Sequence, residues 1–224
     1  MIKPNLQDMY NIIGIAKKAG DAIMQIYQKD FEVEYKADQS PLTEADLASH
    51  RIILEELKRD YPNTPILSEE SDRNFTLNDP NEAFWCVDPL DGTKEFIKKN
   101  GEFTVNIALI QNQQPTLGVI VVPAKNKVFA AVEGEGAYKG VNGTALEPIL
   151  VKTQDVSNLT FAVSRSHKDE VTQAFVSHHN AIIIEAGSAL KLVLVAEGLV
   201  DAYPRFGPTM LWDIAAGHCI INEA

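Results

Sequence analysis

The sequence predicts a protein of mixed α+β and α/β class, in which helices flank a mixed sheet. Three observations carry this prediction. Apolar residues recur at helical spacing near the N-terminus, β-branched runs fill the middle of the chain, and short apolar runs alternate with helical patterns in the last third. Alternation of this kind is typical of sheets with helices packed on their faces.

The N-terminal part is expected to contain two amphipathic helices. The spacing of apolar residues predicts the first helix over 6–27, and a short extended segment and a polar loop at 37–41 follow it. Thr43 begins the second helix, which runs to about Tyr61, where prolines follow. Thr43 and Asp46 have the spacing of a capping box, with Asp in place of Glu.

The middle of the chain is expected to form buried strands. Ile66–Leu67 and 84–87 are short apolar runs that lead directly into acidic residues. Three longer runs predict a meander, at 104–110, 117–122 and 128–132. Glycines after these runs mark a boundary near residues 140–150. We therefore expect an N-terminal α+β half over 1–145 and a C-terminal α/β half over 146–224.

The C-terminal half is expected to alternate strands with helices. The predicted strands lie at 159–163, 181–184 and 200–203, and the predicted helices at 169–177, 188–196 and 211–221. This alternation argues for a mixed sheet flanked by helices.

Composition narrows the class of protein. The chain has 224 residues, 45% of them hydrophobic and 23% charged, which is typical of a soluble globular protein. The net charge of −11 argues against a nucleic-acid polymer as partner, because binding one needs a basic surface. No apolar run approaches the roughly 20 residues of a membrane span. Cys86 and Cys219 lie among apolar residues and fit buried free thiols, so we expect a cytoplasmic protein, with peripheral contact to the inner membrane left open.

The strongest chemical signal is the segment Trp85–Thr93. An apolar run delivers Asp88, and Asp91 returns to the same place after a proline turn. Two carboxylates this close repel each other unless cations lie between them, and hard oxygen ligands select Mg²⁺, Ca²⁺ or Mn²⁺. Gly92 and Thr93 open a short helix, whose free N–H groups suit a phosphate. A plain turn is the alternative for the isolated motif, since turns prefer Asp, Pro and Gly.

These residues carry a family resemblance. The segments 68–71, 88–93 and 212–213 resemble the Mg²⁺-dependent, Li⁺-sensitive phosphatases of the inositol monophosphatase superfamily. Longer segments resemble its 3′(2′),5′-bisphosphate nucleotidase branch, at 91–98, 101–108, 164–167 and 203–209. The resemblance covers nearly the whole chain and implies a layered αβαβα sandwich, the sugar-phosphatase fold, with the site between its halves. Family members continue beyond the last predicted helix, so we expect a C-terminally shortened chain of lower stability.

The resemblance also implies the metal ligands. Glu69, Asp88 and the Leu90 carbonyl would hold one Mg²⁺, and Asp88, Asp91 and Asp213 a second. Family members often hold a third, weaker Mg²⁺ near the position of Glu69, which also places Glu69 among the catalytic residues. Taken alone, Glu69 suits a solvated acidic turn and Asp213 a first-turn helix acid.

A water-activating pair follows from the same resemblance. Asp46 and Thr93 would orient or deprotonate the attacking water, and the Gly92 and Thr93 amides would hold phosphate oxygens. Lys36 would restrain the neighbouring loop beside the metals. The simpler alternatives are that Asp46 only caps its helix, that Thr93 only begins one, and that Lys36 is an exposed loop lysine.

Substrate contacts are implied in the C-terminal half. Residues that would meet the nucleotide and its second phosphate are Ser164, His167, Ser188, Lys191 and Arg205, in addition to Glu69, Leu90, Asp91 and Asp213. Two of them follow a strand and precede a helix, a location where α/β sheets bind ligands. His167 as a polar helix-start residue and Lys191 as an exposed helix lysine are the simpler interpretations.

The implied reaction converts 3′-phosphoadenosine 5′-phosphate and water into AMP and phosphate, which would support sulfur assimilation. A phosphatase of inositol monophosphate or of a sugar bisphosphate shares every metal ligand and differs only in the pocket. A non-catalytic protein that binds nucleotide or Mg²⁺ is the alternative from another class. No motif in the sequence predicts an oligomeric state.

Overall fold

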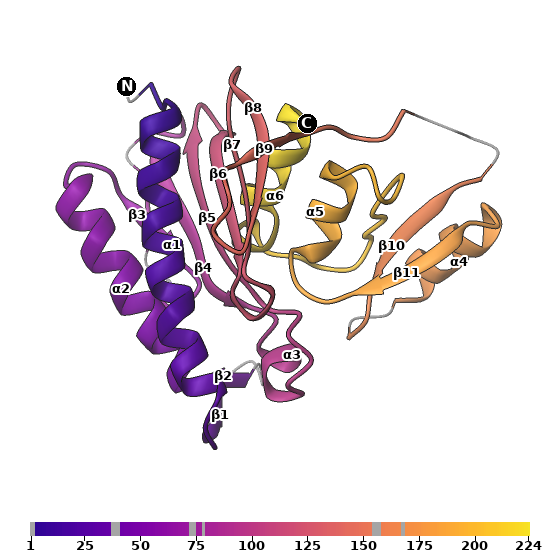
Figure 1. The fold of residues 1–224 in the computed structure, drawn as a ribbon, viewed down its shortest axis with the longest axis horizontal. Coiled ribbons are helices and arrows are strands. Elements are labelled where there is room, and N and C mark those ends of the chain that lie inside the picture. Colours follow the sequence, from indigo (N-terminus) through magenta and orange to yellow (C-terminus); the bar gives the residue numbers. More distant parts are fainter. Residues whose placement is uncertain (1–2, 37–40, 72–74, 78, 154–157, 167–168) are drawn as a thin grey trace.

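The computed structural model describes residues 3–36, 41–71, 75–77, 79–153, 158–166 and 169–224. The helices are α1 (Leu6–Tyr27), α2 (Glu44–Asp60), α3 (Thr93–Ile97), α4 (Glu170–His178), α5 (Leu190–Ala196) and α6 (Leu211–Glu223), and Pro123–Lys125 forms the 3₁₀ turn η1. They alternate with two sheets in the order α-β-α-β-α: α1 and α2, the large sheet, α5 and α6, a small sheet, and α4 (Figure 1). The layered sandwich implied by the sequence is therefore confirmed.

The large sheet has seven strands in the order β3-β4-β5-β6-β7-β8-β9. Its strands are β3 (Ile66–Ser68), β4 (Phe84–Asp91), β5 (Thr104–Gln111), β6 (Gln114–Val122), β7 (Lys127–Val132), β8 (Gly136–Val141) and β9 (Glu147–Ile149). β3 pairs with β4 in parallel, and the following neighbours pair antiparallel. The antiparallel meander expected from the β-branched runs is present in β5, β6 and β7.

The two faces of this sheet build two separate cores. Along β4, Trp85 and Val87 pack against α1 and α2, while Phe84 and Cys86 belong to the core that α5 and α6 cover. Successive side chains of a strand point to opposite faces, and a strand buried on both faces reads as a continuous apolar run. Cys86 and Cys219 are both free and buried, as the sequence indicated.

The first two helices begin where their caps predict. Asn5 caps α1 and exchanges hydrogen bonds with Asp8, and α1 spans the range predicted from its apolar spacing. Thr43 caps α2 in the expected box with Asp46. Each box satisfies backbone N–H groups that the first helical turn leaves without a partner.

Helix α6 lies unusually close to the sheet and to α5. A Cβ at Gly118 in β6 would lie 2.4 Å from the carbonyl oxygen of Ala216 in α6. A Cβ at Gly217 would lie 2.4 Å from Leu192 Cδ1 in α5. Only glycine fits at either position, and the close packing fixes the start of α6, where Asp213 lies.

The small sheet pairs β10 (Thr160–Ser164) with β11 (Ile182–Ala186) in parallel. The strand predicted at 200–203 is wrong: within the described residues, this segment makes only one isolated bridge, between Ala202 and Phe161. Pro204 follows at once, and a proline has no N–H to extend the pairing.

Other predictions need correction at the edges of elements. Strands β8 and β9 were not predicted: they lie in the glycine-containing segment after β7, where glycine tolerates the tight turns between them. Pro41, predicted as loop, starts β2 (Pro41–Thr43), which pairs with β1 (Val33–Tyr35). The rest of that loop, 37–40, lies outside the described residues. The division into halves at 145 and 146 stays a prediction.

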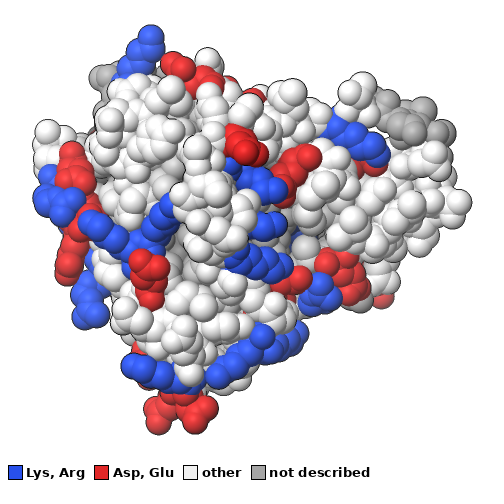
Figure 2. Space-filling model, viewed as in Figure 1, with Lys and Arg blue, Asp and Glu red and all other residues white. Residues whose placement is uncertain are grey.

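Surface and helix properties are ordinary. On the face drawn in Figure 2, acidic and basic side chains are interspersed across the surface. Among the described residues, every helix falls short of the length and apolar character that crossing a bilayer demands.

Candidate active site

A pocket of about 330 Å³ lies where the large sheet meets the C-terminal layers. Residues of its lining that bear chemistry are Glu69, Asp88, Asp91, Thr93, Glu95, Ser164, Ser188, Lys191, Tyr203, Arg205 and Asp213. They come from the ends of β3, β4 and β10, from the starts of α3, α5 and α6, and from the loop before α6 that carries Tyr203 and Arg205. Glycine Gly92 and the backbone of Leu90 also line it.

The turn from β4 to α3 forms one wall. β4 is buried along most of its length, so Asp88 is only 1% exposed, and its Oδ1 accepts a hydrogen bond from the Leu90 amide at 3.1 Å. Gly92 has a φ of 90°, which a residue with a side chain rarely adopts. Its conformation turns the chain sharply into α3, so that Thr93 begins the helix facing the pocket wall.

Asp46 and Thr93 are in contact. The Thr93 hydroxyl donates to Asp46 Oδ1 at 3.2 Å, and the other carboxylate oxygen accepts from the Thr43 hydroxyl at 2.6 Å and from the Thr43 amide at 2.8 Å. Capping and contact with Thr93 therefore coexist on the two oxygens of one carboxylate. Burial raises the pKa of Asp46, and the hydrogen bonds from Thr43 and Thr93 oppose that rise.

Lys36 holds the acidic end of β3. Its ammonium lies 3.0 Å from Glu69 Oε1 and 2.6 Å from Glu70 Oε1. Burial alone would lower the pKa of Lys36, but the hydrogen bond to Glu70 and the charge of Glu69 raise it above its ordinary value. Lys36 is thus part of an ion-paired cluster beside the pocket and is not an exposed loop lysine.

Asp213 enters the pocket from the other half of the chain. It lies in the first turn of α6, and its Oδ2 accepts from the Thr209 hydroxyl and from the Met210 amide, both at 2.9 Å. Asp213 is therefore an acid in the first turn of a helix and also an acid that lines the pocket.

The four acids share one electrostatic environment. Burial raises the pKa of Asp88 well above its ordinary value, and the charges of Glu69, Asp91 and Asp213 add to the rise. Burial also raises the pKa of Asp91 to about 7, opposed by Lys191. Carboxylates that raise one another's pKa in this way are stabilised as anions by a cation among them.

The donor set suits a hard divalent cation. Carboxylate oxygens and a backbone carbonyl are the ligands that Mg²⁺, Ca²⁺ and Mn²⁺ prefer. In the described residues as they stand, no three acidic, histidine or cysteine side chains are gathered tightly enough to enclose an ion. Glu69 is held by Lys36 and Asp213 by Thr209, so cation binding would draw these two carboxylates from their present partners.

Another part of the lining is basic and hydroxylic. Lys191 is only 6% exposed; its ammonium donates to the Ser188 carbonyl and lies 5.2 Å from the centre of the Tyr203 ring. Burial lowers the pKa of Lys191, and Asp91 and Glu95 oppose the shift. Lys191 is therefore a buried cation and not an exposed helix lysine. Arg205 donates to the Pro208 carbonyl at 2.7 Å.

Most of the predicted site residues share the pocket. Lys36 and Asp46 do not line it but contact Glu69 and Thr93, which do. His167 lies outside the described residues. Every other residue predicted for metal, water or substrate contact lines the pocket.

Sequence reasoning missed three supporting residues. Asn106 in β5 is 1% exposed and donates to Asp91 Oδ2 at 3.3 Å. Ser49 is fully buried and donates to the Pro89 carbonyl at 2.6 Å. Glu95 is 3% exposed and accepts a hydrogen bond from the Ser166 hydroxyl. The one local signal concerns Asn106, because a polar residue within an apolar strand is expected to have a buried partner.

Comparison with known proteins gives one family. The model of the inositol monophosphatase family matches residues 5–224. The 3′(2′),5′-bisphosphate nucleotidase CysQ of Escherichia coli K12 is 46% identical over 216 residues, which cover 94% of this chain and 85% of the relative.

Solved structures agree with that result. The crystal structure of CysQ from Bacteroides thetaiotaomicron, described as a bacterial member of the inositol monophosphatase family, is 41% identical with a TM-score of 0.79, over 96% of this chain and 85% of that one. The inositol monophosphatase of Anabaena (Nostoc) sp. PCC 7120 is 29% identical with a TM-score of 0.78, over 98% and 82% of the two chains.

Proposed function

Because the chain belongs to the inositol monophosphatase family, we propose that it is a metal-dependent 3′(2′),5′-bisphosphate nucleotidase. Its reaction removes the 3′-phosphate of 3′-phosphoadenosine 5′-phosphate and gives AMP and phosphate. Relatives that carry this name are 33–46% identical over most of the chain. Buried free thiols suit a reducing compartment, so we place the enzyme in the cytoplasm.

One observation supports this substrate class most directly. The pocket has an acidic wall around Asp88 and Asp91 and a basic wall around Lys191 and Arg205. A bisphosphorylated nucleotide has two anionic groups, and only one of them reacts. The acidic wall suits the reacting phosphate when cations are bound, and the basic wall suits the phosphate that stays on the product.

We assign the cation to Mg²⁺, with two ions bound. Glu69, Asp88 and the Leu90 carbonyl would hold one, and Asp88, Asp91 and Asp213 the other. When bound, the two ions supply charge that polarises the phosphoryl group, lowers the pKa of water and stabilises the leaving oxygen. The protein has a net negative charge and the site is lined by carboxylates, so bound cations must reverse the local charge before an anionic substrate can approach.

Thr93 and Asp46 prepare the attacking water. The Thr93 hydroxyl donates its proton to Asp46 Oδ1, so its oxygen lone pairs face away from the carboxylate and are left to accept a proton from water. The hydrogen bonds from Thr43 fix the Asp46 carboxylate and therefore the direction of the Thr93 hydroxyl. A water held by Thr93 loses its proton toward this pair as it attacks phosphorus.

Backbone and basic groups hold the phosphates. The amides of Gly92 and Thr93 would bind oxygens of the reacting phosphate, because a glycine at the helix start lets an anion approach closely. We assign the nucleotide and its second phosphate to Ser164, His167, Ser188, Lys191 and Arg205. The Lys191 ammonium, buried against Tyr203, supplies the least screened positive charge among the described members of this set.

A substrate panel tests the proposal. Phosphate release is measured from 3′-phosphoadenosine 5′-phosphate, inositol 1-phosphate and fructose 1,6-bisphosphate, each with Mg²⁺ and with EDTA. The proposal predicts Mg²⁺-dependent turnover with the highest kcat/KM for the nucleotide. A higher value for inositol 1-phosphate or the sugar would assign the chain to another branch of the family. Nucleotide binding without phosphate release would indicate a non-catalytic binding protein.

A further inference from the structure

Glu102 connects three segments around the pocket, and the reaction outlined above does not use it. It lies between α3 and β5, just after Gly101. Its Oε2 accepts from the Gly187 amide at 2.9 Å and from Arg165 Nε at 3.0 Å, and its Oε1 accepts from Arg165 Nη2 at 3.2 Å. Gly187 follows β11 and Arg165 follows β10, so one carboxylate of the N-terminal half holds two loops of the C-terminal half.

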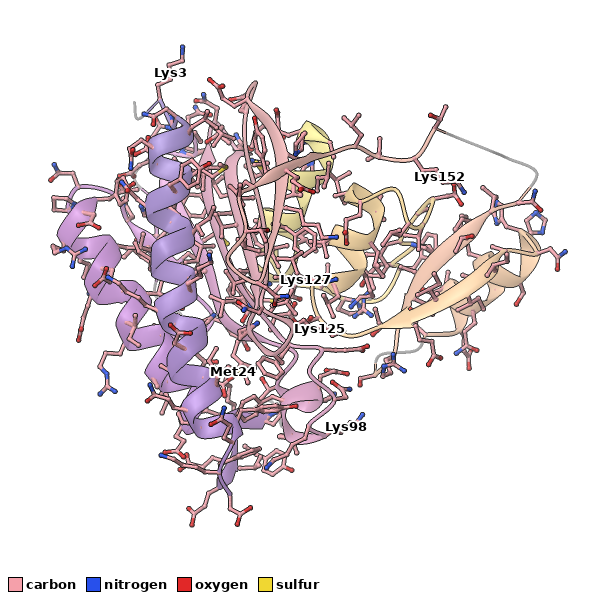
Figure 3. All side chains as sticks on the ribbon, viewed as in Figure 1. Lys3, Met24, Lys98, Lys125, Lys127 and Lys152 are labelled. Atoms are coloured by element: carbon pink, nitrogen blue, oxygen red, sulfur yellow. The ribbon has the colours of Figure 1, made fainter. Side chains whose placement is uncertain are left out.

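The carboxylate of Glu102 stays ionised in this position. Burial alone would raise its pKa, but the hydrogen bonds from Arg165 and Gly187 outweigh burial and hold the pKa below its ordinary value. Figure 3 labels two lysines near this junction: the Lys125 ammonium lies 4.0 Å from Glu102 Oε1, and Lys98 donates to the Ser166 hydroxyl at 3.2 Å. The charge of Glu102 is thus compensated by the neighbouring basic groups Arg165 and Lys125.

The turn that Glu102 holds is packed without free space. A Cβ at Gly187 would lie 2.6 Å from Glu95 Cγ and 2.9 Å from the Glu102 carbonyl oxygen. A Cβ at Gly92 would lie 3.1 Å from Ser188 Cβ. The Gly187–Ser188 turn therefore rests directly on the turn that carries the proposed phosphate amides.

Ser188 has an uncommon conformation that faces the ligand. Its φ is 46°, in the left-handed region that favours glycine. Its Oγ is buried, lines the pocket and has no hydrogen-bond partner within the described part of the chain. A buried hydroxyl without a partner is costly and gains one when a ligand binds. The Ser188 carbonyl also accepts from Lys191, so the turn positions both the hydroxyl and the ammonium.

We propose that Glu102, clamped by Arg165, is a positioning residue that sets the preference for bisphosphorylated over monophosphorylated nucleotides. It fixes the Gly187–Ser188 turn, and the turn presents Ser188 and Lys191 to the second phosphate of the substrate. The reacting phosphate is assigned to the Gly92 and Thr93 amides, whereas the Glu102 carboxylate bonds to Gly187 and Arg165, so binding of that phosphate is expected to depend less on the clamp. This inference rests on the proposed function, because it concerns the second phosphate of the same substrate.

Three variants separate this role from a general structural one. Glu102→Ala removes both contacts of the carboxylate. Glu102→Gln keeps a carbonyl oxygen that can accept from the Gly187 amide. Glu185→Gln is the matched control: Glu185 Oε2 lies 3.6 Å from Arg165 Nη1 and its side chain is 38% exposed, whereas the Gly187 amide donates to Glu102.

Phosphate release is measured from 3′-phosphoadenosine 5′-phosphate and from 3′-AMP, which lacks the second phosphate. Inhibition by the product AMP, which retains the second phosphate, is measured as well. Glu102→Ala is expected to raise KM for the bisphosphate and Ki for AMP about tenfold, with kcat little changed and kcat/KM for 3′-AMP within about twofold of wild type. Glu102→Gln is expected to restore most of the lost affinity, and Glu185→Gln to match wild type.

The outcomes are distinct. Equal losses on both substrates in Glu102→Ala, or no loss on either, would overturn the positioning role and leave the proposed function standing. A wild-type enzyme that releases no phosphate from the bisphosphate would remove the proposed function, and the inference with it. A lower Tm in Glu102→Ala would not by itself support the inference. Partial unfolding lowers activity on both substrates, whereas the positioning role predicts a loss on the bisphosphate alone.

Discussion

The two walls of the pocket are built differently. The acidic wall lies on buried elements: Asp88 lies within a strand that is covered on both faces, and Thr93, which lines the pocket, contacts Asp46 in the first turn of a long helix. The basic wall lies on a short helix and a loop: Lys191 belongs to α5, which follows β11, and Arg205 to the loop before α6, and four of the five residues of β11 are exposed. Chemistry that needs exact geometry is thus placed on the rigid part of the fold, and recognition on the part where substitutions cost less.

The strongest challenge to this comparison removes one acid. Asp91→Asn keeps the shape of the side chain and its contact with Asn106 but removes charge where cations are assigned. We expect kcat to fall on the order of 10³-fold or more while the fold is kept, because cation-assisted stabilisation of the transition state is worth several kcal/mol. Steady-state kinetics and circular dichroism check this. Substantial activity with Mg²⁺ in Asp91→Asn would contradict the role of the acidic wall.

A change at Thr93 tests the water-activating pair. Thr93→Val is nearly isosteric and removes the hydroxyl, so we expect kcat to fall about 10²-fold, in the range of general acid–base catalysis. Thr93→Ser keeps a hydroxyl in reach of Asp46 and is the matched control, with activity near wild type. If valine and serine variants were equally active, the pair would have only a capping role.

A change at Lys191 tests the basic wall. Lys191→Met keeps the buried chain and removes the charge, so KM for the bisphosphate is expected to rise about tenfold with a smaller change in kcat. Lys98→Met removes an exposed charge at the end of α3 and serves as the control. A loss confined to kcat would place Lys191 in the chemistry and blur the distinction between the walls.

The smallest expected effect concerns stability. Ser49→Ala leaves the buried Pro89 carbonyl without its donor, and we expect the free energy of unfolding to fall by about 1–2 kcal/mol. Ser177→Ala, at an exposed position of α4, should change it by less than about 0.5 kcal/mol. Denaturant titration compares them. Equal effects would show that the acidic wall is no more tightly held than the surface.

Local patterns predicted the acidic wall better than the basic one. The bounds of α1, the start of α3 and the capping of α2 follow from residues that are close in sequence. β8 and β9 were missed because their glycines resemble a linker, although each strand pairs with the one that precedes it in the sequence. Contacts such as Glu102 with Gly187 join residues 85 apart, and no local pattern carries that information.

Asp213 is where the two halves meet, because it belongs to the C-terminal half but lines the pocket beside Asp88 and Asp91. The central claim is that these acids together hold divalent cations. The most direct measurement is calorimetric titration of Mn²⁺ into wild type and Asp213→Asn. The account predicts saturable binding by wild type and the loss of at least one ion in Asp213→Asn. Identical titrations of the two proteins would contradict it.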